Sequence, residues 1–285
     1  MFSIIIPSLN NLNYLKLCIA SIKKNSIFDH EIIIHVNVGD DGTINYLNLN
    51  KIKYTHTVVN SGICEGVNLA SKLSSKEFIL YAHDDFYFCP NWDKSLFDEI
   101  KKIGHNKFYL SGTMIETSGK ISLNCGSTVE NFNENKLLSK YKELDFKDFQ
   151  GSTWAPHLVH KDLWNKIGGF SEEYFPGTGS DPDLNKKLWD EGVRIFKGLK
   201  NCMVYHFGST VTRKNVNKSY NTESGSKGAK IFLLKWGISI KFFKKFYLKS
   251  NTPYDGILNE PKKNWLYLLN LIKCKILYLY YKVVF

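Results

Sequence analysis

Several features that define other protein classes are missing from this chain of 285 residues. Its six cysteines lie far apart and form no CxxC pair, which argues against a zinc ribbon, a redox dithiol and a disulfide scaffold. The sequence contains no run of ~18 uninterrupted apolar residues, so a membrane-spanning helix is not expected. Neither GxGxxG after the first apolar run nor a P-loop GxxxxGKS/T is present, which disfavours a nicotinamide site and a P-loop site.

Hydrophobic residues make up 43% and charged residues 23% of the chain, an ordinary globular composition. One α/β domain with an appendage fits the length. The first residues, MFSIIIPSLNN, have no basic stretch and no small-residue cleavage site follows them. We expect them to form a core strand rather than a signal peptide, and we expect the protein to be cytoplasmic.

The net charge of +11 is concentrated at one end of the chain. Residues 1–212 contain 23 Lys/Arg and 24 Asp/Glu, whereas residues 213–285 contain 15 Lys/Arg and 3 Asp/Glu. This basic tail indicates an anionic partner, either a membrane surface or a nucleic acid.

Apolar, β-branched runs alternate with loops and helical patterns at the start of the chain. Strands are predicted at 2–7, 31–36, 53–59 and 78–82. A helix capped by Asn13 is predicted after the first strand, and another at 66–73. This rhythm predicts a mostly parallel sheet covered by helices.

The pattern after residue 110 is less regular. Residues 119–150 are polar and are predicted to form loops over the sheet. Residues 181–190 are predicted to form a helix, with Asp181 as N-cap and Pro182 at the first helical position. A last strand is predicted at 201–205, and His206 follows it directly.

Polar residues follow each of the first four predicted strands. They are Ser8 and Asn10, Asp40 and Asp41, Asn60, and the run His83–Asp84–Asp85. Ligands of open α/β sheets bind outside the carboxyl ends of the strands. The four clusters are therefore expected to meet at one ligand-binding edge.

Two of these features have the chemistry of a metal site. Adjacent carboxylates at a strand end, Asp84 and Asp85, suit a hard divalent cation, although a solvated acidic turn explains the pair as well. A lone histidine is more often structural, but His206 at its strand end could complete a metal site begun by Asp85.

Each of two further acidic pairs has both a functional and a structural interpretation. Asp40 and Asp41 could accept hydrogen bonds from a base or ribose, or could form a β-turn. Asp181 and Asp183 follow a glycine-rich loop. They could present a general base at a rigid helix start, or could cap that helix.

Six segments, in this order and spacing, resemble the family 2 glycosyltransferases from Phe2 to about Lys214. They are FSIIIPSLNN, HVNVGDDGT, NSGICEGVNLA, FILYAHDDF, HKDLWNKIGGFSEEYFPGTGSDPDLNKKLW and VYHFGS. The resemblance implies a glycosyltransferase A-type fold, with a Rossmann-like, mostly parallel sheet flanked by helices. It also implies inverting transfer of a sugar from a nucleotide-diphosphate sugar, with UDP favoured, to a hydroxyl of a surface or envelope glycan.

The resemblance also assigns roles to residues that bind the nucleotide sugar. They are Pro7, Ser8, Asn10, Asn60, Asp84 and, in the second loop, Asp41 with Asp40 as the alternative. Trp154 and His157, together with Trp164, could form a platform for the acceptor sugar, or could pack in the core and lid.

The metal and the base follow from the same resemblance. Asp85 and His206 would bind Mn²⁺ or Mg²⁺, although His83 stands where the family's acidic motif has its first Asp. Asp181 would be the general base, with Asp183 as second choice, although Ser180 replaces the Glu that precedes the base in the family.

The sequence is divided at residue 215 into a catalytic domain, 1–215, and a basic, aromatic C-terminal extension, 216–285. The extension mixes Lys with Trp, Tyr and Leu, which is typical of an amphipathic helix at the inner face of a membrane. Packing of its helices on the catalytic domain or on a second subunit is an equal alternative. Nucleic-acid binding is third, because no nucleic-acid motif is present.

Two other functions remain open. A degenerate glycan-binding or scaffolding module could keep this fold without activity. A sugar nucleotidyltransferase would share the metal, but it would need a glycine-rich, Arg/Lys-bearing loop after the first strand, where this chain has PSLNNLN. The donor sugar and the acceptor cannot be read from any of these motifs.

Overall fold

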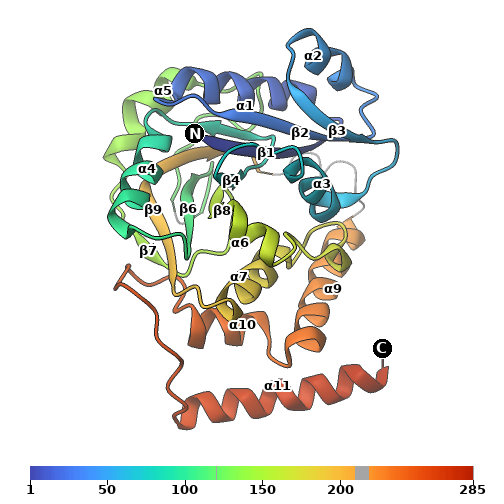
Figure 1. Ribbon diagram of the computed structural model, residues 1–285, viewed down its shortest axis with the longest axis vertical. Coiled ribbons are helices and arrows are strands. Elements are labelled where there is room, and N and C mark those ends of the chain that lie inside the picture. Colours follow the sequence, from blue (N-terminus) through green and yellow to red (C-terminus); the bar gives the residue numbers. More distant parts are fainter. Residues whose placement is uncertain (120, 209–217, 285) are drawn as a thin grey trace.

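The computed structural model describes residues 1–119, 121–208 and 218–284. A nine-stranded sheet forms its centre, in the order β3-β2-β1-β4-β8-β6-β9-β5, with β7 paired to β9 (Figure 1). The strands are β1 (Phe2–Leu9), β2 (Glu31–Asn37), β3 (Lys53–Thr57), β4 (Phe78–Tyr81), β5 (Phe86–Phe88), β6 (Phe108–Ile115), β7 (Phe149–Gln150), β8 (His157–His160) and β9 (Ile195–His206).

Helices lie on both sides of this sheet, with α1 above it and α6 and α7 below it in Figure 1. The helices before the C-terminal extension are α1 (Leu12–Asn25), α2 (Thr43–Leu49), α3 (Gly62–Ser71), α4 (Trp92–Ile103), α5 (Glu134–Lys140), α6 (Lys161–Lys166) and α7 (Ser180–Asp190), with short 3₁₀ turns η1 (Tyr141–Glu143) and η2 (Glu172–Tyr174).

The first four strands are parallel, as the sequence predicts. β1 pairs with β2 and β4, and β2 pairs with β3, all in parallel. β1 is buried along most of its length because helices cover both faces, which explains its continuous apolar run. The second half of the sheet is mixed, since β8 runs antiparallel to β4 and β6.

Two predicted helix N-caps are wrong, and each has a physical reason. The first helix begins at Leu12, so Asn13 lies inside it; the Leu12 N–H donates to Asp41 Oδ2 at 2.7 Å, a cap supplied from a distant loop. Asp181 is the second residue of α7, not its N-cap. The N-cap is Gly179, whose φ of 92° favours glycine.

Other boundaries also differ from the prediction. The segment 119–150, predicted as loops, contains α5, η1 and β7. Helix α2 was not predicted, and the last strand extends back to Ile195. The polar sequence of α5 carries few buried residues, only Leu137, so its periodicity is too weak to be recognised in the sequence.

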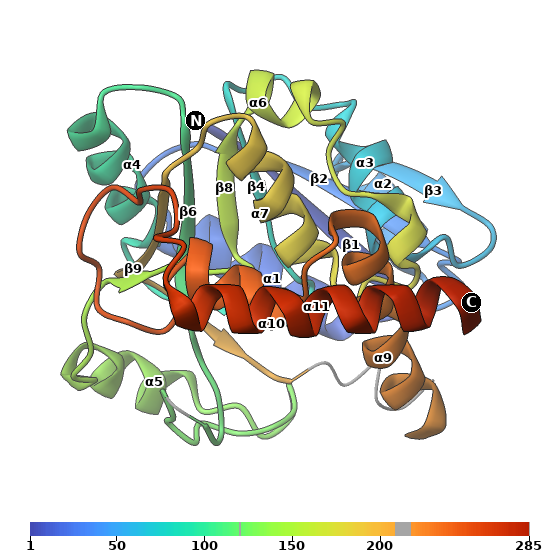
Figure 2. The same ribbon diagram turned by 90° about the horizontal axis from the view of Figure 1, so that it is seen from below.

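The C-terminal extension is helical and packs partly against the body. It comprises α9 (Lys218–Trp236), α10 (Ile240–Phe242), the π-helical turn η3 (Phe243–Tyr247) and α11 (Trp265–Val284). α9 lies beside η2, and α11 lies across α9 and α10 (Figure 2). Within the ranges that the structure describes, no helix combines the length and hydropathy needed to cross a membrane.

Candidate active site

Three of the four predicted loops are joined by hydrogen bonds at the carboxyl edge of the parallel strands. Ser8 Oγ donates to Asp84 Oδ2 at 2.7 Å, which connects the first loop to the fourth. Asn10 Oδ1 accepts from the backbone N–H groups of Gly39 and Asp40 at 2.9 and 3.0 Å, which connects the first loop to the second. Pro7 lies in β1 just before this junction. The predicted convergence of these clusters is therefore present.

The two acidic residues of the second loop differ in what they bind. Both carboxylate oxygens of Asp41 accept hydrogen bonds within the protein, from the N–H groups of Leu12 and Thr43 and from Thr43 Oγ1. Asp40 is exposed. Asn60, also exposed, accepts from the Gly62 N–H at 2.9 Å and so shapes the start of α3.

His83, Asp85 and His206 form a compact cluster, with ligand atoms within 4.8 Å of one another. His206 Nε2 lies 3.4 Å from Asp85 Oδ2, and His83 Nδ1 lies 4.0 Å from Asp85 Oδ1. His206 Nε2 is buried and makes no hydrogen bond to any described residue. Two imidazoles and a carboxylate facing one point form a donor set for a divalent metal ion.

The two imidazoles of this cluster have pKa values shifted in opposite directions. Burial lowers the pKa of His83 to about 4, so this imidazole is neutral at pH 7. Burial also acts to lower the pKa of His206, but the nearby Asp85 and Glu116 outweigh it and the pKa is raised. Glu116 Oε1 lies 2.9 Å from His206 Nδ1, which orients the ring and leaves Nε2 toward Asp85.

Asp181 lies on the first turn of α7, and its side chain is 29% exposed. Its Oδ1 is buried and has no hydrogen-bond partner in the described ranges. Burial raises the pKa of Asp181 to about 7, an effect that the positive charge of Lys244 on η3 partly opposes. A carboxylate that titrates near neutral pH is well suited to accept a proton.

His157 connects Asp181 with the metal-type cluster. His157 Nδ1 lies 3.9 Å from Asp181 Oδ1, and both ring nitrogens are buried without a hydrogen-bond partner among described residues. The rings of His157 and His83 both pack against Tyr81, with centroids 5.1 and 5.4 Å away. Asp181 and the His83–Asp85–His206 cluster are thus separated by two packed rings.

Asp183 is fully buried and bound on several sides. Its carboxylate accepts hydrogen bonds from Ser171 Oγ at 2.6 Å and from Trp236 Nε1 at 2.8 Å, and it pairs with Lys235 Nζ at 3.1 Å. These bonds attach α9 to α7, which favours a structural role for Asp183.

The predicted aromatic platform is mainly buried. Trp164 is 2% exposed and its Nε1 donates to Ser71 Oγ at 3.1 Å, so it packs in the core. His157 is 1% exposed. Trp154 is partly exposed and stacks on Phe149, with ring centroids 5.2 Å apart. For Trp164 the packing alternative is correct.

Three residues of the site have roles that the sequence does not predict. His83 is expected at the ligand-binding edge, but the sequence marks it as a departure from the acidic motif and not as a metal ligand, although its position beside Asp85 is compatible with ligation. Glu116 directly follows β6, so the same rule of polar residues after strands could have found it. The charge of Lys244 on η3 acts on Asp181, and no local sequence signal indicates this interaction.

Comparison with known proteins agrees with this geometry. The profile described as "Glycosyl transferase family 2" matches residues 3–152. No curated protein sequence matches significantly. Solved structures with the same fold include S. aureus TarS residues 1–349 in complex with UDP-GlcNAc, at 16% identity and TM-score 0.56, covering 82% of this chain and 66% of that one. Full-length TarS gives TM-score 0.58 at 16% identity, covering 82% of this chain and 39% of that one.

GalNAc-T7 with UDP, GalNAc and Mn²⁺ is similar over 72% of this chain and 43% of that one, at 13% identity and TM-score 0.56. At these identities the neighbours establish only the fold, which is the predicted glycosyltransferase A-type. The profile match spans more than half of the chain and therefore shows the family. This chain belongs to glycosyl transferase family 2 and is a glycosyltransferase.

Proposed function

We propose that this enzyme transfers a sugar with inversion from a UDP-sugar to a hydroxyl group of a surface or envelope glycan, using a divalent metal ion. The observation that carries the proposal is the pairing of Asp181, whose pKa is raised to about 7, with the His83–Asp85–His206 cluster across the rings of Tyr81 and His157. In this proposal Asp181 is the base and the His83–Asp85–His206 cluster is the metal site of one reaction centre.

Each group has a chemical task in that reaction. Asp181 accepts the proton of the acceptor hydroxyl, whose oxygen attacks the anomeric carbon from the face opposite the leaving diphosphate. One displacement inverts the configuration, so the protein needs no nucleophile of its own. A divalent ion at His83, Asp85 and His206 would stabilise the negative charge of the diphosphate, and the two imidazoles favour Mn²⁺ over Mg²⁺.

The donor is proposed from two kinds of observation. Structural neighbours were solved with UDP and with UDP-GlcNAc. In this chain, Ser8 and Asp84 join the first and fourth loops at the edge where such a donor would lie. The exposed Asp40 is a better candidate for a base or ribose contact than Asp41, because both oxygens of Asp41 are already hydrogen-bonded.

A nucleotide-dependent thermal shift tests this donor assignment. We expect UDP with Mn²⁺ to raise the unfolding midpoint by several degrees, since a ligand at 100 times its Kd stabilises the native state by about 2.7 kcal/mol. GDP, dTDP and CMP with Mn²⁺, and UDP with EDTA, are the controls. No shift with any nucleotide would contradict the donor site and favour a glycan-binding or scaffolding module.

We also propose that α11 holds the enzyme at an anionic membrane surface. One stripe of this helix is exposed and apolar, at helical spacing: Trp265, Ile272, Ile276, Leu279 and Val283. The opposite stripe, which includes Tyr267 and Cys274, is buried against the body. Lys273, Lys275 and Lys282 are exposed on α11, as lysines at a lipid headgroup layer would be.

Co-sedimentation with vesicles containing phosphatidylserine or only phosphatidylcholine measures this association. We expect binding to the anionic vesicles, and we expect Ile272→Glu/Ile276→Glu to abolish it. Leu49→Glu is the matched control, because Leu49 is 75% exposed on α2 in the catalytic part. If the wild-type protein does not co-sediment with either kind of vesicle and is a dimer by analytical ultracentrifugation, this stripe is instead a contact between two copies.

A further inference from the structure

The carboxylate of Asp181 has a buried oxygen on one side and an exposed part on the other. The side chain is 29% exposed, but its Oδ1 atom is buried and accepts no hydrogen bond within the described ranges. The carboxylate oxygen that an acceptor hydroxyl can reach is therefore Oδ2. Oδ1 faces inward, and His157 Nδ1 lies 3.9 Å from it.

His157 on β8 is a buried histidine without a polar partner. Its side chain is fully buried, and neither ring nitrogen makes a hydrogen bond to a described residue. Aromatic contacts fix the orientation of the ring, because the ring centroids of Tyr109, Tyr81 and Phe170 lie 4.9, 5.1 and 5.9 Å away. A buried polar group without a partner costs free energy, so an unpartnered ring next to an unpartnered carboxylate oxygen indicates a function for the pair.

Two rigid elements set the distance between His157 and Asp181. One turn beyond Asp181 on α7, Asn185 Nδ2 donates to Ser152 O at 2.9 Å, in the segment that leads into β8. Asn185 and Ser152 are both fully buried. This bond attaches α7 to the chain before β8, so the helix that carries the carboxylate and the strand that carries the imidazole are held in register.

The proton of the neutral His157 ring is favoured on the nitrogen that faces the carboxylate. Burial lowers the pKa of His157 to about 3, so the ring carries a single N–H at pH 7. An ionised carboxylate accepts hydrogen bonds and repels a lone pair, which favours the tautomer with the proton on Nδ1. His157 is then a donor to Asp181 and does not compete with it for the proton of the acceptor.

We propose that His157 is a positioning residue that donates its Nδ1–H to Asp181 Oδ1 during sugar transfer. This inference rests on the proposed function, because it concerns the base of the same reaction. The separation of 3.9 Å exceeds that of a hydrogen bond, yet catalytic hydrogen bonds are often long without substrate and tighten when substrate binds. Neither atom has another partner among the described residues, so closing the gap breaks no bond. The bond keeps Oδ1 inward, leaves Oδ2 for the acceptor hydroxyl, and favours the ionised carboxylate.

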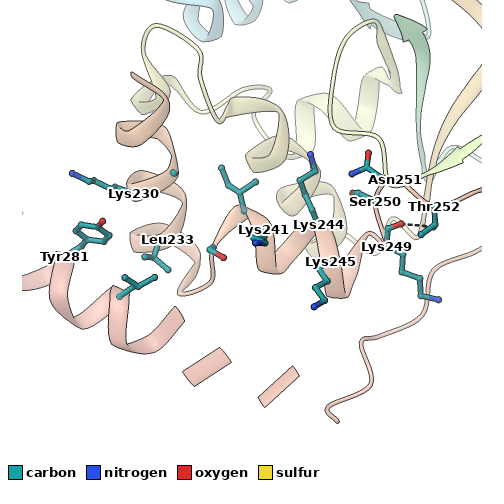
Figure 3. A pocket seen from close by; sticks show the side chains of 14 residues that line it. Lys230, Leu233, Lys241, Lys244, Lys245, Lys249, Ser250, Asn251, Thr252 and Tyr281 are labelled. Atoms are coloured by element: carbon teal, nitrogen blue, oxygen red, sulfur yellow. Dashed lines mark hydrogen bonds between the residues drawn. The ribbon is translucent and has the colours of Figure 1, made fainter. Parts of the chain in front are cut away.

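Other titratable groups also act on Asp181. They include Lys244 on η3, Tyr81 on β4, Tyr109 on β6 and Cys64 on α3. Burial raises the pKa of both phenols well above 10 and that of the thiol to about 12, so all three are neutral at pH 7. Lys244 lies in the wall of a cavity of about 940 Å³ and leaves η3 in the direction opposite to Lys245 (Figure 3). All these groups stay unchanged in the variants below, so a difference between variants reports on His157.

The tautomer of His157 is measurable without any substrate. In ¹⁵N-histidine NMR spectra of the full-length protein at pH 8, the shifts of the two ring nitrogens show which one carries the proton. The signals missing from His157→Asn assign this ring. We expect the proton on Nδ1 in the wild type and a weaker preference in Asp181→Asn, because the charge that selects this tautomer is gone. A proton on Nε2 in the wild type would overturn the proposal.

Titration of the Asp181 carboxyl carbon by ¹³C NMR measures the effect of the donor on the base. His157→Phe keeps a ring between Tyr81, Tyr109 and Phe170 but removes both nitrogens, so its unfolding midpoint should equal or exceed that of the wild type. With UDP and Mg²⁺ present, we expect the pKa of Asp181 to be about one unit higher in this variant, a tenfold change in the ionisation equilibrium. His157→Asn places an amide N–H near the position of Nδ1 and should restore the lower pKa.

His160→Phe is the matched control on the same strand. His160 is buried at the opposite end of β8, where it pairs with Phe78, and its Nδ1 accepts from the Asp162 N–H at the start of α6. This substitution should lower the unfolding midpoint, because the cap is lost, without changing the pKa of Asp181. If His157→Phe leaves the pKa of Asp181 at the wild-type value, or if His160→Phe raises it equally, His157 does not position the base.

The outcomes separate this proposal from the proposed function. If UDP does not bind, the donor assignment fails, and the tautomer and the same titrations without UDP still decide whether His157 acts on Asp181. If Asp181→Asn transfers sugar at the wild-type rate, the proposed base is wrong and the role of His157 is lost with it. Loss of transfer in Asp181→Asn, together with an unchanged pKa in His157→Phe, contradicts the role of His157 alone.

Discussion

Asp181→Asn is expected to lower the rate of sugar transfer by about 10²–10⁴-fold, the usual contribution of a general base. Asn has nearly the same shape but cannot accept the proton of the acceptor hydroxyl. The metal-type cluster proposed for the donor diphosphate lies across the rings of Tyr81 and His157, so the affinity for UDP should not change. Steady-state kinetics and UDP titration of the same preparation measure the two quantities.

The pH profile gives an independent check. In the proposed reaction the ionised form of Asp181 is the active one, and burial raises its pKa to about 7. The kcat/KM of the wild type should therefore fall as the pH drops below 7, by about tenfold per pH unit. Asp181→Asn should lose this dependence, and an unchanged profile in the variant would exclude Asp181 as the base.

Stability should respond in the opposite sense to activity. Because burial raises the pKa of Asp181 from 3.8 to about 7, the ionised carboxylate opposes folding above pH 4 and does so most strongly above pH 7. The Asn variant should consequently unfold at an equal or higher temperature at pH 8.

Asp183→Asn provides the contrasting control on the same helix. Asp183 is fully buried and hydrogen-bonded to Trp236 and Ser171, so its loss should lower the unfolding midpoint. A stable but inactive Asp183→Asn protein would move the catalytic assignment from Asp181 to Asp183.

Asp85→Asn is expected to abolish most metal-dependent activity, with a loss of at least about 10²-fold in transfer rate. Asp85 is 4% exposed and lies between His83 and His206, so the amide keeps the packing while removing the negative charge that attracts the ion. Calorimetric titration with Mn²⁺ in the presence of UDP measures the affinity, and activity at rising Mn²⁺ concentration measures the consequence.

Two control variants show what loss of Mn²⁺ affinity to expect when no ligand atom is removed. Glu116→Gln removes the negative charge beside His206 Nδ1 but keeps an oxygen acceptor and touches no ligand atom, so Mn²⁺ affinity should fall by only about 10–100-fold. Asp98→Asn removes an exposed carboxylate that pairs with Lys94 on α4, and it should change nothing. Equal Mn²⁺ affinity in Asp85→Asn and wild type would show that the cluster holds no catalytic ion.

The parallel half of the sheet could be predicted because its signals are local. The strands β1, β2 and β4 are short apolar runs that end in polar residues, and burial produces those runs. The edge strand β3 is more polar and has no buried residue. The convergence of Ser8, Asn10 and Asp84 follows from strand direction alone. The resemblance to a family added the roles that local patterns left open.

The rest depends on contacts between distant segments. Asp41 caps α1 from 29 positions along the chain, which is why Asn13 was the wrong cap. Gly179, in the left-handed region, is the N-cap of α7, so Asp181 lies inside the helix. The charge of Lys244 in the C-terminal extension acts on the pKa of Asp181, and no pattern in either segment indicates this interaction.

The hydrogen bond from Trp236 to Asp183 has a consequence for how this enzyme can be divided. One turn of α7 carries both Asp181 and the carboxylate that anchors α9. A chain ending at residue 215 would lose Trp236 and Lys235, leaving Asp183 buried with fewer donors, and would also lose the positive charge of Lys244 that acts on Asp181. Exchange of catalytic units between relatives would therefore have to transfer α7 and the C-terminal extension as a matched pair.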